Sequence, residues 1–439
     1  MAAAPWCHAA AHNVAMFAGA ISGSHLPESI GQAAMGRRNR FRRDLSASLI
    51  VFLVALPLCL GIAIASGAPP ERGLVTGIIG GIVAGRLAGS PLSVSGPAAG
   101  LTTLVFEVVS RHGLAALGPI VLLGGALQVL GGVARVGGYV RAIPASIVEG
   151  MMAAIGLILT ASQLHVMLDT APAAGFLANV RHFGGMAADG NYAAFGIGAL
   201  TIAAMLGWER WRPAGLREIP GALLAVVVAT ACAALLGLQV ARVVLPASFA
   251  GAVSLLRPGQ LSELASPALL GSAVSVALIA SIESLLSAAA VNRMMPRRRT
   301  DYSRELVAQG IGNMACGLVG ALPMTGVIVR SAANVRAGAR TRASAVLHGV
   351  WLLALVVVAP GLLRLVPTAS LAGLLVVVGL RLVNPHHVRA MAREGARGVA
   401  VYATTVAVIL CTNLLTGIVA GLGLYVLLKA LSGLVRRSA

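Results

Sequence analysis

The fold is decided by two stretches: SVSGPAAGLTTL at residues 93–104 and GALPMTGVIVRSAANV at residues 320–335. Each interrupts a long apolar run with glycine and proline. A break at membrane depth persists only where its backbone is buried in protein or lines a cavity. One such break in each half of the chain is typical of the central binding site of a secondary transporter. The short helix after each break would point its free N-terminal amides inward, which favours an anion.

The composition is that of a polytopic helical membrane protein. Hydrophobic residue types make up 58% of the 439 positions, charged residues make up 11%, and the mean hydropathy is +0.88. A soluble domain is about a quarter charged. Several apolar runs reach the roughly 20 residues that cross a hydrocarbon core. The predicted spans are 46–66, 73–89, 96–110, 115–134, 144–167, 190–208, 219–240, 267–290, 304–319, 326–336, 343–361, 367–382, 399–412 and 415–431.

The net charge of +19 does not indicate nucleic-acid binding, because the basic residues gather on one side of the predicted membrane. Of the 33 Lys and Arg residues, 25 fall in the segments assigned to the cytoplasm and 6 in those assigned outside. Arg86 and Arg330 lie at span edges or within the membrane. This bias follows the positive-inside rule. It predicts a multi-pass protein of the cell inner membrane, embedded in the lipid bilayer with both termini cytoplasmic.

The chain divides into a tail and two similar halves. Residues 1–43 are predicted to form a cytoplasmic N-terminal tail, residues 44–245 a first repeat and residues 262–432 a second. The third span ends in SRHGL and the tenth in NVRAGARTR, so charge places these ends on opposite sides. We therefore predict an all-α membrane protein of fourteen transmembrane segments, arranged as 7+7 inverted repeats with two half-helices meeting at mid-membrane. No soluble C-terminal domain is expected after the last span.

The first break offers bare backbone amides at Ala98, Ala99 and Gly100. Pro97 fits the first helical turn, where the amide that it lacks would have no partner in the helix. The small side chains beside it leave the amides uncovered, so we predict that they contact an anion. The alternative is an ordinary turn before a tightly packed helix.

The second break offers the amides of Gly326, Val327 and Ile328, followed by Arg330 about two turns into the span. An intramembrane arginine is costly and is a functional hypothesis by default. Arg330 is predicted to attract the anion. A structural pairing with a carboxylate or with carbonyl groups is the alternative.

Glu283 is the clearest acidic residue deep within a span, and Ser287 lies one turn later on the same face. The carboxylate could bind Na⁺, carry a proton or pair with Arg330, and a purely structural salt bridge is the alternative. Pro57 is expected to kink or locally unwind the first span, which lets Leu58 face the cavity. No nucleophile–base arrangement, metal-ligand spacing or cofactor motif points to an enzyme.

In these stretches the chain resembles the SulP (sulfate permease) family, bacterial relatives of the animal sulfate, chloride and bicarbonate exchangers. The matching stretches cover nearly the whole chain outside the tail: VALPLCLGIAIASGAPP (54–70), LSVSGPAAGLTTLV (92–105), SIVEGMMAAIGLIL (146–159), ASIESLLSAAAVNRM (280–294), ELVAQGIGNMACGLVGALPMTGVIVRS (305–331) and ASLAGLLVVVGLRLV (369–383). The resemblance implies inverted repeats with a core domain that moves against a gate domain like an elevator. It also implies a homodimer.

The family also implies roles for individual residues. Its anion sits between the N-termini of the third and tenth spans. In bicarbonate transporters of this type, the positions of Glu283 and Ser287 bind Na⁺, with backbone and hydroxyl groups matching Gly326, Val327 and Ile328. A basic residue of the animal exchangers matches Arg330. Two departures put a Na⁺ site in doubt, because Ile328 and Ala98 stand where the family has threonine.

The predicted function is secondary active transport of a small inorganic anion such as sulfate, bicarbonate or chloride, coupled to H⁺ or Na⁺. The family's STAS regulatory domain is not expected here, and members without it are sometimes joined to carbonic anhydrase, which slightly favours bicarbonate. A nucleobase permease of the same architecture is one alternative, although it would need a carboxylate on the tenth span. A passive anion channel lined by the same helix ends and Arg330 is the other.

Overall fold

The structure is a computed structural model. It describes residues 37–438 apart from 139–143, 174, 217–218, 247–250, 252, 258, 261–265, 296–299, 384, 386–387, 390–391 and 393–394. Residues 1–36 of the predicted tail lie outside the described residues. Its last residues, 37–43, form the first turns of a helix that continues as the first span.

Helices make up most of the described chain, and each predicted span falls on one or more of them. They are α2 (Arg37–Ala65), α3 (Pro70–Ile79), the π-helix η1 (Gly80–Ala84), α4 (Gly85–Leu87), α5 (Thr102–His112), α6 (Leu117–Val133), α7 (Ala145–Met167), α8 (Phe176–Arg181), α9 (Phe183–Asp189), α10 (Tyr192–Trp211), α11 (Gly221–Leu235), α12 (Pro267–Met294), α13 (Tyr302–Leu318), α14 (Ile328–Arg336), α15 (Ala343–Val358), α16 (Pro360–Leu363), α17 (Thr368–Leu382), α19 (Ala396–Cys411) and α20 (Leu414–Ser438).

Six helical stretches among the described residues are long and apolar enough to cross a membrane. They are Asn39–Ala65, Leu114–Val133, Ala145–Met167, Tyr192–Trp211, Pro267–Met294 and Leu414–Leu431. Shorter apolar helices are α11, α15, α17 and α19. α2 runs unbroken through Pro57, so of the two outcomes expected at this proline, a kink or local unwinding, the unwinding is wrong.

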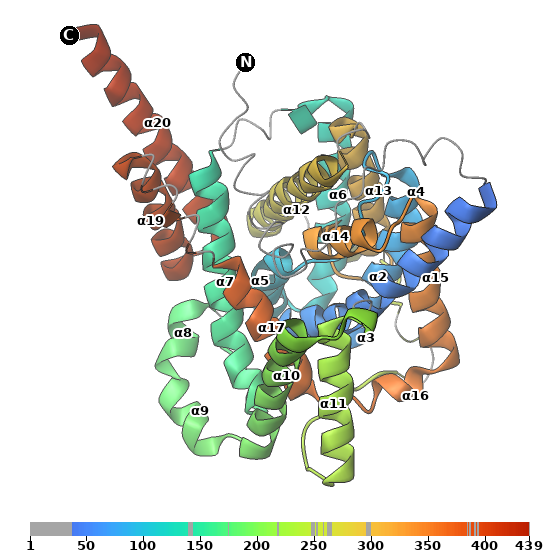
Figure 1. The fold of residues 1–439 in the computed structure, drawn as a ribbon. Coiled ribbons are helices and arrows are strands. Elements are labelled where there is room, and N and C mark those ends of the chain that lie inside the picture. The colour runs from blue at the N-terminus through green and yellow to red at the C-terminus, as the bar shows by residue number, and fades with distance from the viewer. Residues whose placement is uncertain are drawn as a thin grey trace.

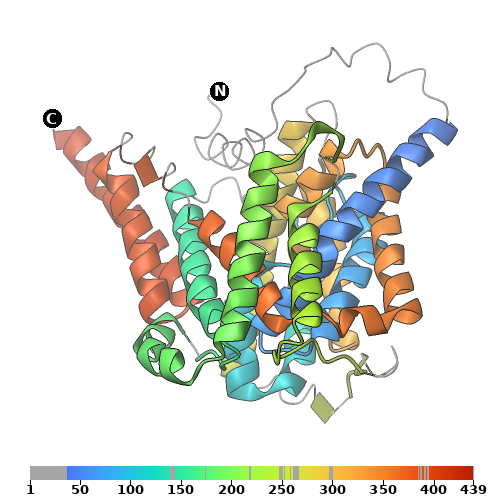
Figure 2. The ribbon, with the colours of Figure 1, turned by 60° about the horizontal axis from the view of Figure 1, so that its bottom comes forward.

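The helices pack as two groups (Figure 1). The first helix group comprises α2–α6 and α12–α15, with α13 packed most extensively on α6. The second helix group comprises α7, α10, α11, α17, α19 and α20. Figure 2 shows α10 and α11 side by side in front, with α19 and α20 at the left edge. The first group therefore contains both broken spans.

Heptad-spaced glycines bring α6 and α13 into backbone contact. Gly118 and Gly125 of α6 face Gly317 and Gly310 of α13. A Cβ at Gly310 would lie 2.6 Å from the carbonyl oxygen of Gly125, and one at Gly317 would clash with the backbone nitrogen of Leu122. Small residues are what allow such close approach between membrane helices. This packing fixes α13 as a rigid support behind the broken spans.

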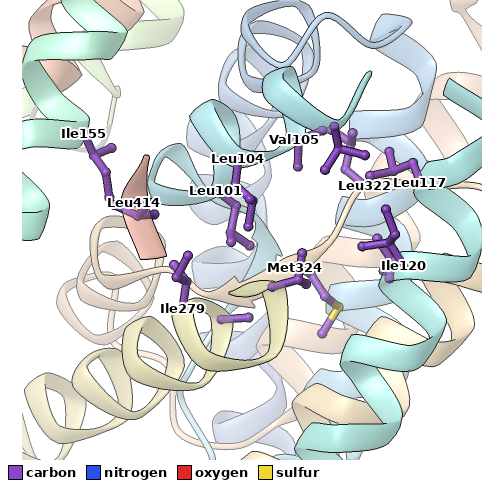
Figure 3. Packing of buried hydrophobic residues seen from close by; sticks show 14 of the residues in the cluster. Leu101, Leu104, Val105, Leu117, Ile120, Ile155, Ile279, Leu322, Met324 and Leu414 are labelled. Carbon is purple, nitrogen blue, oxygen red and sulfur yellow. The ribbon is translucent and has the colours of Figure 1, made fainter. Parts of the chain in front are cut away.

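An apolar cluster fills the space between the first helix group and α7. Figure 3 shows Leu101 and Leu104, from the first broken span, beside Met324 of the second, with Ile279 of α12 close by. Ile120 of α6 belongs to the same buried cluster. Hydrophobic packing therefore borders the point where the two breaks meet.

The two breaks form strands, a departure from the all-α prediction. β1 (Ser95–Pro97) pairs antiparallel with β2 (Met324–Gly326), and all six residues are buried. A 3₁₀ turn, η2 (Ala99–Leu101), follows β1 and leads into α5, whereas α14 begins two residues after β2. The half-helices thus leave from opposite ends of one short antiparallel ribbon.

We expect Gly310→Ala to destabilise the protein, because its methyl group has no room against Gly125. Overpacking of this kind costs about 1–3 kcal/mol. The apparent Tm in detergent should fall, whereas Gly271→Ala on α12 should leave it unchanged or raise it slightly. A Cβ at Gly271 meets no atom within 4 Å. An equal Tm for both variants would contradict this account of the α6–α13 contact.

Candidate functional site

The centre of the candidate site is the ribbon that β1 and β2 form. Ser95 lies opposite Gly326, Gly96 opposite Thr325 and Pro97 opposite Met324. The amide of Val327 donates to the carbonyl of Val94 (2.9 Å), which extends the ladder by one bond. Stretches more than 200 residues apart are thereby held in register.

The outer edge of β2 is bonded to neighbouring helices. Met324 exchanges two hydrogen bonds with the side-chain amide of Asn313, and the amide of Gly326 donates to Ser284 Oγ (3.1 Å). The amides of Gly326 and Val327, predicted to contact an anion, therefore already have partners within the protein. Their direct contact with a ligand stays a prediction that requires these bonds to open.

The helix starts beyond the ribbon leave other amides without an acceptor. Among the described residues, no hydrogen bond is recorded from the amides of Ala99, Gly100 or Ile328, which begin their helices. The first amides of any helix lack an intrahelical partner. These three amides therefore lack a partner within the described protein, and their contact with an anion stays a prediction. Ala98 precedes η2 in an extended conformation and is buried.

Arg330 is fully buried at the first turn of α14. Its Nη2 lies 3.5 Å from the carbonyl oxygen of Pro97, and its Nε and Nη1 have no hydrogen-bond partner among the described residues. A Cβ at Gly96 would clash with Nη1, so the guanidinium occupies space that only glycine leaves open. The buried side chain of Cys59 on α2 lies close to the guanidinium.

Glu283 of α12 also reaches the first broken span. Its side chain is 8% exposed, Oε2 has no hydrogen-bond partner among the described residues, and the Thr325 side chain lies beside the carboxylate. A Cβ at Gly100 would clash with Oε1, so the carboxylate rests directly against this glycine. No ion pair joins Glu283 to Arg330, both of which the structure describes. Their predicted pairing, one of the alternatives, is therefore absent from this structure.

Ser287 and Leu58 complete the predicted set. Ser287 Oγ lies 3.5 Å from Ser331 Oγ, one turn into α14, and its Cβ lies against Gly326. Leu58, on α2, is 7% exposed and packs in an apolar cluster. The structure thus brings Ser287 to the ribbon, whereas it places Leu58 among apolar neighbours.

A cavity of about 100 Å³ lies along α5. Thr102, Thr103 and Arg111 of α5 line one wall, and the opposite wall includes Ser162 of α7 and Asn413 at the start of α20. Neither Glu283 nor Arg330 lines this cavity. It lies between the two helix groups and runs from the start of α5 to the end that we predict to face outside.

Sequence reasoning missed several buried polar partners of the ribbon. One face of α13 carries Glu305, Gln309 and Asn313 at intervals of four residues. Ser284 accepts a hydrogen bond from β2, and Ser331 accepts one from the amide of Val94, the residue before β1. His348 of α15 is fully buried near Arg330, and neither ring nitrogen has a partner among the described residues. Polar residues at four-residue spacing within ELVAQGIGN were the available signal for the α13 set.

These features define a class: helical membrane transport proteins whose binding site is built from two discontinuous spans. The chain belongs to the sulfate permease family, whose profile matches residues 41–405. The match includes both breaks, Glu283 and Arg330.

Curated relatives agree with this family. The chain is 30% identical over 394 residues to the putative sulfate transporter YvdB of Bacillus subtilis, covering 87% of this chain and 72% of that protein. It is 26% identical over 365 residues to the bicarbonate transporter BicA of Picosynechococcus, covering 78% of this chain. That alignment spans 62% of BicA, so the chain matches less than two thirds of this relative's length.

Solved structures share the fold. The transmembrane domain of a cyanobacterial bicarbonate transporter BicA superposes with a TM-score of 0.76 at 24% identity, covering 88% of this chain and 98% of that domain. Murine Slc26a9, an anion transporter in its inward-facing state, gives a TM-score of 0.76 at 14% identity, covering 95% of this chain and 75% of that one.

We predict that the cavity along α5 is reached from the aqueous phase. In a variant without the native cysteines, Ser162→Cys should react with a membrane-impermeant maleimide, because Ser162 lines the cavity. Ile155→Cys, two turns away on α7 and fully buried, should stay unlabelled. Labelling of both positions at the same rate, or of neither, would contradict an open cavity.

Proposed function

We propose that this protein is a secondary active transporter of a small inorganic anion such as sulfate, bicarbonate or chloride in the bacterial inner membrane. Its family and the names of its relatives support anion transport. The observation that carries the proposal is the fully buried Arg330, which lies in the first turn of α14 and whose guanidinium reaches the carbonyl of Pro97, just before η2. Helix N-termini and a cation together stabilise negative charge in a medium of low dielectric constant.

The anion is proposed to bind where η2 and α14 begin. Ala99, Gly100 and Ile328 would offer amides without acceptors, and Arg330 would supply a positive charge that no carboxylate among the described residues neutralises. A small inorganic anion accepts hydrogen bonds in several directions, which suits converging backbone donors. The acceptor atoms of these anions are oxygens or a halide, which differ little in shape. The proposed amides and Arg330 would therefore select an anion over a neutral solute better than they would select sulfate over bicarbonate.

Glu283 is proposed to couple anion movement to H⁺ or Na⁺. Its carboxylate lies against Gly100 and beside the Thr325 side chain, and it has an oxygen without a hydrogen-bond partner in the described part of the chain. That oxygen could take a proton or contribute to a Na⁺ site with Ser287. Ile328 supplies no hydroxyl, which reduces the oxygen ligands for Na⁺. Uptake driven separately by a pH gradient and by a Na⁺ gradient would distinguish the two ions.

Movement of the first helix group against the second is proposed to expose the site alternately to the two sides, as in an elevator. The cavity along α5 lies at the boundary between the groups and would be the access route in this conformation. A homodimer, inverted repeats and cytoplasmic termini belong to the same proposal.

Radiolabelled uptake into proteoliposomes tests the function, with sulfate, bicarbonate and chloride supplied under an imposed pH or Na⁺ gradient. Accumulation of one anion above its external concentration is the expected result. Conduction without accumulation would instead establish a passive channel. Protection of the protein against heat by uracil or xanthine, with no effect of any anion, would favour a nucleobase permease.

Arg330→Ala is expected to raise the half-saturating anion concentration at least tenfold, equivalent to about 1.4 kcal/mol. The reason is that it removes the guanidinium that lies at the ribbon. Gly96→Ala should also raise the half-saturating concentration, although the charge of Arg330 is retained, because the added methyl group displaces Nη1. Arg86→Ala, at the edge of the second span, is the control. An unchanged half-saturating concentration in a folded Arg330→Ala protein would remove Arg330 from this role.

Glu283→Gln is expected to abolish gradient-driven accumulation while anion exchange across the membrane persists. The amide is close in shape to the carboxylate but neither titrates nor carries charge. Glu149→Gln on α7 serves as the control, since Glu149 has no proposed transport role. Accumulation that persists in Glu283→Gln would refute the coupling assignment.

A further inference from the structure

We propose that Asn313 of α13 serves as a third strand for β2 and thereby positions the N-terminus of α14 for the anion. The positioning role rests on the proposed function, because that helix start is part of the proposed anion site. The bonding role does not, since it follows from the geometry of the ribbon alone.

The side-chain amide of Asn313 bonds β2 as a neighbouring peptide group would. Its Nδ2 donates to the carbonyl oxygen of Met324 (3.0 Å), and its Oδ1 accepts the amide of Met324 (2.7 Å). Asn313 and Met324 are both fully buried. One side chain thus satisfies both backbone groups of one residue, which is the two-point contact of an antiparallel pair.

β2 needs this contact because of its register with β1. Neighbouring pairs in an antiparallel ladder alternate between bonded and non-bonded. The bond from Val327 to Val94 marks Ser95 and Gly326 as a non-bonded pair, so Gly96 and Thr325 exchange the hydrogen bonds, while Met324 points its polar groups away from β1. Pro97, opposite Met324, has no N–H to donate in any case. Without Asn313, a buried amide and a buried carbonyl would have no partner, which is costly inside a membrane.

Asn313 is itself held in one orientation. Its Nδ2 also donates to Gln128 Oε1 of α6 (2.7 Å), and Gln128 Nε2 donates to Ser281 of α12 (3.3 Å). These bonds determine which end of the amide faces Met324. They also connect β2 through α13 and α6 to the helix that carries Glu283. The close α6–α13 packing leaves this chain of contacts little freedom to shift.

The same face of α13 also holds the β1 side. Gln309, one turn before Asn313, donates from Nε2 to Ser95 Oγ (2.7 Å), and Glu305, a further turn back, accepts the amide of Ser90 (2.8 Å). One rigid helix therefore determines the position of both strands along the axis of α13. Because only Thr325, Gly326 and Val327 separate Met324 from Ile328, a shift of β2 is carried directly into the start of α14.

Asn313→Leu tests the proposal, because leucine has a similar size but makes neither bond. Hydrogen exchange in the peptide 320–331, followed by mass spectrometry, should become at least tenfold faster, while peptides from α6 keep their protection. In proteoliposomes the half-saturating anion concentration should rise about 5- to 50-fold, as expected for two lost hydrogen bonds. The maximal rate per folded molecule should change less.

Gln163→Leu on α7 is the matched control. It also removes a buried side-chain amide from a span, but Gln163 donates to Ser162 Oγ (3.4 Å) and has no hydrogen bond to the ribbon. It should change neither measurement. Asn313→Ser removes both bonds without placing an apolar group against Met324, and it replaces the leucine variant if that protein does not fold.

The results separate the two parts of the proposal. Unchanged exchange in 320–331 in a folded variant would overturn the bonding role. Faster exchange with an unchanged half-saturating concentration would overturn the positioning role. If the wild-type protein transports none of the anions tested, the proposed function fails, whereas the exchange measurement still decides whether Asn313 holds β2.

Discussion

The pairing of residues 95–97 with residues 324–326 is the contact on which the rest of the structure depends. In a ribbon of only two strands, about half of the backbone N–H and C=O groups point away from the partner strand. Within a bilayer no water is available to bond these outward-facing groups. The edges must therefore be covered by side chains at fixed heights. Ser284 and Asn313 cover β2, and the carbonyl of Pro97 faces Arg330. This requirement accounts for the buried polar residues of α12, α13 and α14.

The two halves of the chain contribute differently to the site. The second half supplies both buried charges, Arg330 and Glu283, whereas the first half supplies the space for them at Gly96 and Gly100. The two charges form no ion pair with each other. A buried charge without an ion-pair partner does not stabilise the fold, because the free-energy cost of removing it from water exceeds the free energy gained from a few hydrogen bonds. A role in binding accounts better for keeping both.

The sequence was sufficient to predict the two breaks, their meeting and the residues that carry charge there. Glycine and proline within an apolar run leave backbone groups without helical partners, and such groups persist at membrane depth only inside protein. Arg330 stands out in the sequence because burying a charged side chain within the membrane costs free energy. The strands could not be predicted, since SGP and MTG have no alternating pattern and three residues are too few to show a period. The role of Asn313 was also beyond reach. The sequence shows a polar residue in an apolar span but not the group that this residue bonds. That group depends on the rotation of α13 about its axis, and the contacts of Gly310 and Gly317 with α6 determine this rotation.

The boundary between the helix groups differs in chemistry from their interiors. Within the first group, backbone contacts at glycine and the hydrogen bonds around the ribbon give α6, α12, α13 and β2 little freedom to separate. Between the groups, a Cβ at Gly61 of α2 would lie 3.3 Å from Leu375 of α17, within an apolar cluster drawn from both sides. Apolar contacts are not directional, so their energy changes little as one surface slides over another, whereas a hydrogen bond is lost within a fraction of an ångström. Such a boundary suits the proposed movement, because the ribbon, Arg330 and Glu283 can travel together with their bonds intact.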